Sequence, residues 1–579
     1  MRILVSVVCL LLASCTSAPA GPDWQSVLSN SARPQEAEAY GDYLAARYAA
    51  ISNEPSEAAV RYGRALQRSP ANADVMEKAV YEWLLAGDFD KAAKLARQSR
   101  EGPVDVAPIA RLVTAIDAYR KGEYELVAEL LQGKDLGAFN ASLANLLIAW
   151  SFEARGDTET ALMHLSQSNG DFVDQLKVFS QAYVLLHSGR NDEALATLQI
   201  ATQSGLRLPM ALAVEARLLL AEGREDDARE LMQAVDVESA ANTLLFDLKQ
   251  QMDAGREFED VKIDARAGAA MSLIVPIAAL ANRTGGDVSL AYLNMVLALD
   301  PTEHGATIML ADGLNRNDRE SEALVALENV PAGSAYYGAA QSMLAWLYLS
   351  EEDKEKAKLA AANAVAASPA RSIKVQVGDL YRTMEEFEQA EIVLAGVVEN
   401  DQAVDRRDWR ALFALGATRE RLQKFDEAEE ALKAALEIEP NRPEVLNYLG
   451  YSWIDRGKNI PEAFSLIRQA ANLRPDAGYI VDSLGWAYYR MGRYTEAVRY
   501  LEHAASLDPD DAVINDHLGD AYWRIGWRVQ ARYQWERVKL FEPDEKTLSS
   551  VMEKLQSGLG PAVTNPGDGG VVQELEELN

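Results

Sequence analysis

Cysteine is almost absent from this chain of 579 residues, which contains only Cys9 and Cys15. Because both lie near the start of the sequence, a fold held together by disulfide bonds is excluded for the rest of the chain. Histidine is also scarce, and none of the five histidines stands in the HExxH spacing of a zinc-binding helix. The sequence also lacks a P-loop, a glycine-rich dinucleotide loop and a GxSxG elbow. These absences argue against an enzyme and against a bound metal.

The chain has fewer basic than acidic residues: 57 Lys and Arg against 88 Asp and Glu, which gives a formal net charge of −31. Phosphate backbones repel such a surface, so nucleic acid is not expected as a partner. A basic protein would be attracted to it instead. The simpler interpretation, that an acidic surface only keeps the protein soluble, stays open at this stage.

Long apolar segments are also missing. The run Ile3–Ala13 is too short to span a bilayer, which takes ~20 helical residues. It follows Met1-Arg2, so the start of the chain has the positive and apolar regions of a secretory signal peptide. The run ends in Leu12-Ala13-Ser14-Cys15, which resembles the lipobox of bacterial lipoproteins.

The lipobox resemblance implies that residues 1–14 are removed and that Cys15 becomes the lipidated first residue of the mature chain. Multiple acyl chains anchor a protein stably, whereas one does so only marginally. Thr16 follows where an Asp would imply retention at the inner membrane, so the resemblance implies the periplasmic face of the outer membrane. Residues 15–36 then form a lipidated tether. The alternative is an ordinary secretory signal in which Cys15 is incidental.

At 579 residues the chain is too long for one hydrophobic core, because single cores stop growing near ~250–300 residues. An internal repeat explains the length. A Leu-Gly pair recurs at steps of 34, 35 and 34 residues, followed by an Ala and then by a Pro. The markers are Gly416, Gly450, Gly485 and Gly519, then Ala428, Ala463, Ala497 and Ala531, then Pro440, Pro475, Pro509 and Pro543.

One unit of the repeat predicts two helices. Leu446, Leu449, Gly450 and Trp453 have the i, i+3, i+4, i+7 spacing of an apolar helical stripe. A second stripe follows and ends before Pro475, because proline cannot continue a helix. The Gly and the Ala are small where the two helices cross. Since one pair cannot bury both of its faces, neighbouring pairs must stack.

This pattern resembles the tetratricopeptide repeat, which implies an all-α solenoid, a right-handed superhelix of about fourteen helix pairs. The resemblance covers roughly residues 37–545. We divide it into a degenerate array over 37–400 and a near-consensus array over 401–545, because the phase slips between Glu399 and Asp408. One degenerate unit is expected between Ala228 and Ser289. Residues 546–579 are expected to hold a helix end and a disordered acidic tail.

In this family the first helix of each pair lines the concave face of the superhelix. The candidate peptide-binding groove is therefore a second stripe on those helices, offset from the packing stripe. Aromatic side chains interleaved with carboxylates there would suit a peptide that carries Lys or Arg. The groove residues are Arg410, Phe413, Asn447, Tyr451, Tyr479, Asp482, Trp486, Tyr489, Asp516, Asp520 and Trp523, with Ala417, Glu420, Glu444, Ile454 and Val513 on the same stripes.

Tryptophan is concentrated in these last units. Trp453 and Trp535 lie on packing stripes and are predicted to be core residues, whereas Trp486 and Trp523 are predicted to face a ligand. Trp527 falls in a turn and is left unassigned. The family's clamp for a carboxyl terminus needs Lys and Asn where this chain has Asp, so we do not predict a reader of such a terminus. Adjacent carboxylates such as Glu429 and Glu430 are interpreted as solvated charge, and the histidines as ordinary core or surface residues.

The expected function is a non-catalytic binding scaffold in the cell envelope. The layout, and particularly the run Val481–Arg490, resembles tetratricopeptide lipoproteins that bind a carboxyl-terminal processing protease and deliver cell-wall hydrolases to it. That resemblance implies protein partners, with a lipid on Cys15 as the sole attached group and no small-molecule substrate. An assembly or export factor for pili, secretion or polysaccharide remains the alternative, and an enzyme is the least favoured interpretation.

Overall fold

The computed structural model describes residues 34–70, 72–100, 107–167, 176–239, 242–281 and 287–560. The predicted signal peptide, Cys15, most of the tether and the acidic tail beyond residue 560 lie outside these residues. Throughout the described ranges the regular structure is helical, and no strand occurs in them. None of the described helices is both long and apolar enough to cross a membrane.

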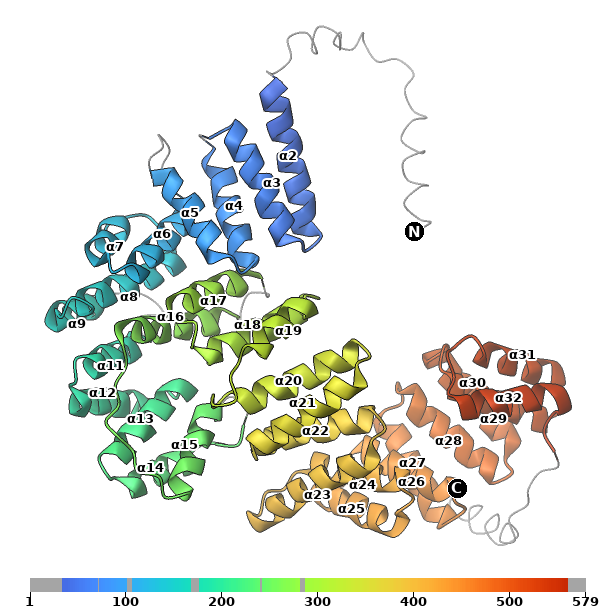
Figure 1. The fold of residues 1–579 in the computed structure, drawn as a ribbon. Coiled ribbons are helices and arrows are strands. Elements are labelled where there is room, and N and C mark those ends of the chain that lie inside the picture. The colour runs from blue at the N-terminus through green and yellow to red at the C-terminus, as the bar shows by residue number, and fades with distance from the viewer. Residues whose placement is uncertain are drawn as a thin grey trace, which may run out of the picture. The chain divides into compact units, whose positions relative to one another are not determined.

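The chain divides into two compact units, residues 1–347 and residues 348–579. The prediction of an all-helical repeat solenoid is confirmed, because the thirty helices described fit about fourteen pairs with α15 and α32 as single helices (Figure 1). The predicted division at 400/401 stays a prediction and falls inside the second unit. The phase slip beside it has a local cause, since α23 has 17 residues where its counterparts α25, α27 and α29 have 14.

The helices of unit 1 are α2 Pro34–Ile51, α3 Pro55–Arg68, α4 Ala73–Leu85, α5 Phe89–Arg100, α6 Pro108–Arg120, α7 Tyr124–Leu131, α8 Ala138–Glu153, α9 Thr158–Gln167, α11 Lys177–His187, α12 Asn191–Gln203, α13 Pro209–Ala221, α14 Glu225–Gln233, α15 Thr243–Asp253, α16 Ala265–Ala281, α17 Asp287–Leu299, α18 His304–Arg316 and α19 Glu320–Glu328, with most of α20 Tyr337–Ser350. The expected degenerate unit is the single helix α15, followed by residues 256–264 without helix.

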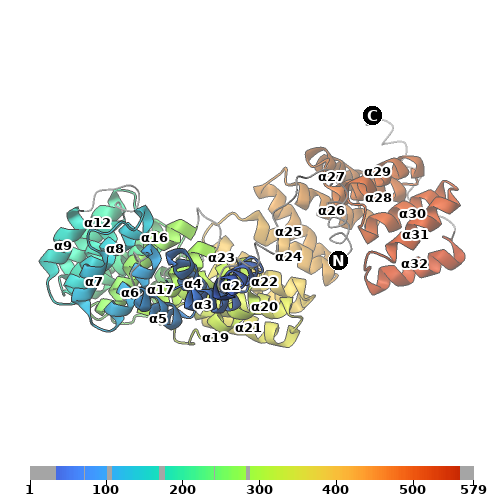
Figure 2. The same ribbon diagram turned by 90° about the horizontal axis from the view of Figure 1, so that it is seen from above.

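The helices of unit 2 are α21 Lys354–Ala367, α22 Arg371–Thr383, α23 Phe387–Ala403, α24 Trp409–Arg421, α25 Phe425–Ile438, α26 Pro443–Asp455, α27 Ile460–Leu473, α28 Gly478–Arg490, α29 Tyr494–Leu507, α30 Ala512–Arg524, α31 Arg528–Val538 and α32 Glu545–Ser557. Within this unit consecutive helices pack as antiparallel neighbours, and the pairs stack in chain order (Figures 1 and 2).

The recurring Gly and Ala of the repeat lie where the two helices of a pair cross closely. A Cβ atom added to Gly450 would lie 2.9 Å from the carbonyl oxygen of Ala463 and 2.7 Å from Cγ1 of Ile467. Only glycine leaves room for the backbones to approach this closely. Trp453 and Ile467 fill the space beside this crossing and are buried, as is Ala463.

The turn between the helices of a pair needs a left-handed residue, which ends the first helix. Gly457, Gly492 and Gly526 adopt φ values of 66°, 76° and 88° at this position. Gln423 holds the equivalent position at φ 61°, a conformation that side chains with a Cβ adopt at a cost. The turn therefore favours glycine, which three of these units have, but accepts glutamine in the fourth.

Candidate partner-binding surfaces

The inner face of unit 1 is occupied by the unit's own helices. The first helices of its early pairs, α4, α6, α8 and α11, are those expected to line a concave face. Helix α16 packs against α8 and α11, and α17 packs against α4 and α6, so two helices from later in the chain cover them (Figure 1).

Specific contacts hold α16 in this place. Trp150 Nε1 donates to Ser272 Oγ at 2.8 Å, and Ser180 Oγ donates to the same hydroxyl at 2.7 Å. Tyr119 OH donates to the carbonyl oxygen of Ala265 at 2.8 Å. The indole of Trp150 lies directly where a side chain on Gly268 would be, so glycine is required there.

Helix α17 is held in the same way. Asn294 Nδ2 donates to the carbonyl oxygen of Leu84 at 2.9 Å, and Tyr292 OH donates to Asn140 Oδ1 at 2.6 Å. These bonds satisfy polar groups that would otherwise be left without partners inside the protein. A partner protein that bound to this face would first have to displace α16 and α17, so the exposed surfaces of the two units are the better candidates for binding.

The predicted groove residues lie on the first helices of the pairs in unit 2, α24, α26, α28 and α30, and the structure gives them unequal exposure. Arg410, Tyr479 and Val513 near the helix starts are exposed, with 47% of Tyr479 accessible. The buried residues of the predicted groove are Asn447, Asp482 and Asp520, together with Ala417 and Ile454 of the same stripes. The half-buried residues are Phe413, Tyr451, Trp486, Tyr489, Asp516 and Trp523, together with Glu420 and Glu444.

Many of these side chains contact the next first helix along the solenoid. The Phe413 ring meets Tyr448 edge-on at a centroid distance of 5.5 Å. Both carboxylate oxygens of Asp482 lie 3.0 Å from His517 Nδ1. The stripe that the repeat pattern assigns to the concave groove is therefore also the seam, the line of contact between the first helices of neighbouring pairs. Spacing in the sequence does not distinguish a groove residue from a seam residue. Whether the stripe also binds a partner stays a prediction.

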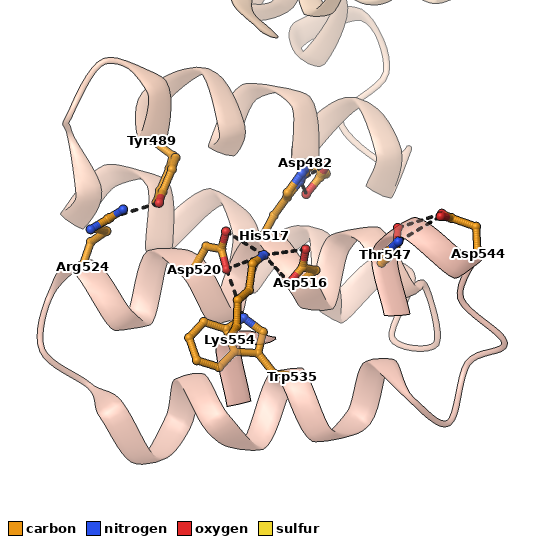
Figure 3. Close-up of polar contacts among 10 residues, drawn as sticks. All are labelled: Asp482, Tyr489, Asp516, His517, Asp520, Arg524, Trp535, Asp544, Thr547 and Lys554. Carbon is orange, nitrogen blue, oxygen red and sulfur yellow. Dashed lines mark hydrogen bonds and ion pairs between the residues drawn. The ribbon is translucent and has the colours of Figure 1, made fainter. Parts of the chain in front are cut away.

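Trp486 lies at the centre of this seam. Its indole stacks on Tyr489 at a centroid distance of 4.6 Å and on His517 at 4.0 Å. The Tyr489 hydroxyl in turn accepts a hydrogen bond from Arg524 Nε at 3.1 Å (Figure 3). The Trp486 Nε1 donor is buried and has no hydrogen-bond partner within the described part of the chain. A buried N–H without an acceptor costs free energy, so a ligand that supplied an acceptor here would bind more tightly.

The last of the described helices, α32, supplies a cation to the acidic end of the stripe. Lys554 Nζ donates to Asp516 Oδ1 at 2.7 Å and to Asp520 Oδ2 at 3.0 Å (Figure 3). Trp535 Nε1 donates to Asp520 Oδ1 at 3.0 Å. Asp544 caps the start of α32 by accepting from the backbone N–H of Thr547, which fixes where the lysine enters. The sequence predicts carboxylates that pair with a Lys or Arg of a bound peptide, whereas in the structure Asp516 and Asp520 already pair with Lys554 of the same chain.

The electrostatics of this cluster follow from one cation among several anions. Burial raises the pKa of Asp520 to about 6, although the ammonium of Lys554 opposes the shift. Burial lowers the pKa of Lys554, but Asp520 and Asp516 outweigh it and the net pKa is raised. For His517 burial also lowers the pKa, and the Asp482 carboxylate reverses the sign. A proton is therefore held more tightly here than in the unfolded chain.

The other tryptophans divide as their environments dictate. Trp453 and Trp535 are buried, which confirms their prediction as core residues. Trp523 is half-buried, and its Nε1 donates to the carbonyl oxygen of Leu559 at 3.3 Å, so residues after α32 lie against it. Trp527, which the sequence left unassigned, precedes α31 and is exposed.

The interpretation of Glu429 as solvated charge is wrong. Its carboxylate accepts hydrogen bonds from Trp453 Nε1 at 3.0 Å, Lys458 Nζ at 2.9 Å and Lys433 Nζ at 2.8 Å. Burial would raise its pKa, but these donors lower it to about 2. Glu430 is exposed as expected. The buried indole N–H of Trp453, on the next pair, needs an acceptor and finds it in Glu429. The spacing of residues on the helix of Glu429 gives no sign of that partner.

A second exposed apolar surface lies on the first described helix. Tyr40, Leu44, Tyr48 and Ile51 of α2 follow one another at i, i+4, i+8 and i+11 and form one stripe, with Tyr48 75% and Ile51 79% accessible. We call this the α2 stripe. Sequence reasoning missed it because α2 has the composition of an ordinary first helix, and only the stacking shows that no preceding pair covers this face among the described residues.

Comparison with known proteins agrees with the helical architecture. Models of the tetratricopeptide repeat match residues 409–442 and 481–511, and a second model of the same repeat matches residues 179–242. The chain contains tetratricopeptide repeats. Such repeats typically form non-catalytic scaffolds for protein–protein interaction. Among the described residues no three His, Cys, Asp or Glu side chains are grouped as metal ligands would be.

Three individual proteins are similar to this chain over different shares of its length. The chain is 36% identical over 94 residues to the TPR repeat-containing protein PA4667 of Pseudomonas aeruginosa, a match that spans only 16% of each chain. A tetratricopeptide repeat protein from Parabacteroides merdae superposes with a TM-score of 0.40 at 14% identity, over 44% of this chain and 99% of that one. The Cut9–Hcn1 hetero-tetramer structure covers 92% of this chain and 98% of that one at a TM-score of 0.36 and 14% identity.

Proposed function

We propose that this protein is a lipid-anchored scaffold of the bacterial cell envelope that holds two different protein partners at the same time. The lipobox-like tetrapeptide ending in Cys15 supports the anchor, and Thr16 supports the outer membrane as its destination. The tetratricopeptide repeats support the scaffold. The resemblance of Val481–Arg490 to protease-binding lipoproteins supports a periplasmic protease and its cell-wall hydrolase substrates as the partners.

One observation carries the proposal: each unit keeps an uncovered surface after its internal contacts are made. In unit 1 the inner face is filled by α16 and α17, and the α2 stripe is left exposed. In unit 2 the helix starts that carry Arg410, Tyr479 and Val513 are left exposed beside the half-buried aromatic seam. Exposed aromatic and apolar groups of this kind mark interaction sites.

The mechanism follows from tethering rather than from bond chemistry. Two proteins bound to one chain meet at a high effective concentration, which raises the rate of their reaction without any new contact between them. A basic partner would also be drawn to the net charge of −31. Because Asp516 and Asp520 already pair with Lys554, and Asp482 already contacts His517, we expect that attraction to act through the general surface charge.

The test is capture of a protease and of wall hydrolases from a periplasmic extract by the purified protein. A variant of the exposed helix starts in unit 2, Arg410→Glu/Tyr479→Ala, and a variant of the α2 stripe, Tyr48→Glu/Ile51→Glu, are compared with Tyr533→Ala. Tyr533 is an exposed tyrosine on α31, outside both surfaces, and serves as the control. We expect each surface variant to lose one class of partner at least tenfold and to keep the other.

Retention of both classes by both variants would show that these surfaces do not bind them. Capture of pilus, secretion or polysaccharide components in place of the protease would favour an assembly factor. The anchor is tested separately with Cys15→Ala, which should move the protein from the membrane fraction to the soluble periplasm. If Cys15→Ala stays with the membrane, lipid attachment at this residue is not the anchor.

A further inference from the structure

A cationic cleft lies in unit 1 and shares no residue with either proposed partner surface. It has a volume of about 470 Å³ and is lined by one face of α5, the end of α6 and the first turn of α16. Its lining residues are Asp90, Ala93, Lys94, Arg97, Asp117, Arg120, Lys121 and Arg266. Five cations and two carboxylates thus meet in a chain whose formal net charge is −31.

Internal ion pairs fix part of this cluster without neutralising it. Asp117, which is almost fully buried, lies 2.5 Å from Arg97 Nη2 and 3.0 Å from Lys121 Nζ. One carboxylate therefore serves two cations. The Nε of Arg97 is buried and has no hydrogen-bond partner within the described residues. A buried guanidinium donor without an acceptor favours an anion that can supply one.

The other three cations that line the cleft are Arg120, Arg266 and Lys94. Arg120 pairs with the exposed Asp90 at 2.9 Å, and its guanidinium lies over the Phe89 ring at 5.1 Å from the centroid. Arg266 Nη2 donates to the backbone carbonyl of Arg120, which positions this guanidinium without giving it a counter-charge. Lys94 has no carboxylate partner in the part of the chain that the structure describes.

We infer that this cleft binds a phosphate group. Several guanidinium groups with free donors match the oxygens of a phosphate, which accepts bidentate hydrogen bonds. The cleft's volume lies within the range of small-molecule sites, ~300–1,000 Å³, so the phosphate can carry an attached group. The site depends on α16 lying across the early pairs, because Arg266 reaches the cleft from its first turn. It does not depend on the proposed scaffold function.

The experiment titrates the purified full chain with inorganic phosphate, against sodium chloride at equal ionic strength, by isothermal calorimetry. The pocket variant is Lys94→Glu/Arg266→Glu, in which both replaced side chains are exposed, so the fold is expected to survive. The control variant is Lys134→Glu/Lys262→Glu, which makes the same charge change at two exposed lysines of unit 1 outside the cleft. The milder Lys94→Gln is the second pocket variant, and thermal unfolding in chloride checks that all of them fold.

We expect phosphate to bind to the wild type and to the control variant, with affinity at least tenfold lower for Lys94→Glu/Arg266→Glu and intermediate for Lys94→Gln. A parallel arm uses phosphatidylglycerol vesicles. Binding of vesicles that is lost in the pocket variant identifies a lipid headgroup as the source of the phosphate, whereas binding of free phosphate alone identifies a soluble one. If neither probe binds, or if pocket and control variants bind equally, the inference is wrong.

Discussion

At the scale of single residues, unit 2 shows how burial changes what a charged side chain does. Asp520 is nearly buried, faces Asp516 and Lys554, and lies in the field of His517. Burial disfavours the charged carboxylate and the neighbouring Asp516 adds to that effect, so Asp520 takes up a proton more easily than an exposed aspartate would, although Lys554 opposes the shift. The sequence shows only a helix with two aspartates four residues apart.

The raised pKa of Asp520 predicts a specific dependence of stability on pH. Its pKa of about 6 in the folded protein lies above the ordinary value of ~3.9, so the folded state binds the proton more tightly. The free energy of unfolding should therefore rise as the pH falls from 7 towards 4, by on the order of 2 kcal/mol from this group. The raised pKa of His517 adds stability that is present below ~6.5 and is lost as the pH rises through the folded value.

Asp520→Asn should flatten this dependence. Urea denaturation at pH 5, 6, 7 and 8 measures it, as the difference between the variant and the wild type so that other titrating groups cancel. Asp510→Asn, at an exposed aspartate between α29 and α30, is the control and should run parallel to the wild type. A difference curve for Asp520→Asn with no slope between pH 5 and 8 would rule out this account.

At the scale of elements, the crossing of two helices in a pair depends on a missing side chain. Gly450→Ala would place a Cβ against the Ala463 backbone, which cannot move aside as a flexible side chain can. We expect it to lower the free energy of unfolding by about 1–3 kcal/mol, the usual cost of overpacking. Gly396→Ala is the control, because a Cβ there meets nothing within 4 Å in α23, and should stabilise by about 0.5–1 kcal/mol. Equal effects of the two substitutions in denaturant titrations would contradict the crossing geometry.

The helix pairs themselves could be predicted because their signals are local. A glycine that ends the first helix, such as Gly457, and a proline that follows the second, such as Pro475, act within a few residues of their place in the sequence. The seam could not be predicted, because the partner of Asp482 lies on the first helix of the next pair and the partner of Asp516 lies on the single helix α32. Spacing on one helix gives its face but not the neighbour that covers it. The covering of the unit 1 inner face could not be predicted either, because α16 and α17 are held by hydrogen bonds to residues that lie up to 210 positions earlier in the chain.

At the scale of the whole molecule, unit 1 departs from a simple stack. In a plain solenoid each pair contacts only its neighbours, so stability adds up pair by pair. Here α16 and α17 join α4, α6, α8 and α11, which are far away in the sequence. The early pairs and the later ones should therefore lose their structure together.

Gly268→Ala tests this coupling, because its Cβ would enter the space of the Trp150 indole. We expect a loss of about 2 kcal/mol for unit 1, and faster hydrogen exchange in α4 and α6 as well as in α16. Gly63→Ala in α3 is the matched control, since a Cβ there meets nothing within 4 Å. If faster exchange stays confined to α16 and its direct contacts, the early pairs are stable without it.

The long connections inside unit 1 also set the order in which it can be completed. The hydrogen bonds Trp150–Ser272, Tyr119–Ala265 and Asn294–Leu84 join residues 122, 146 and 210 positions apart. Contacts between residues so far apart in the sequence slow folding, because the entropy of closing a long loop is lost before the stabilising contacts can form. During synthesis the ribosome releases the N-terminal pairs first. Their apolar inner face stays uncovered until α16 and α17, which end at about residue 300, have also been released. During that interval the unfinished unit is exposed to aggregation, and a chaperone that shields this face would raise the yield of the native protein.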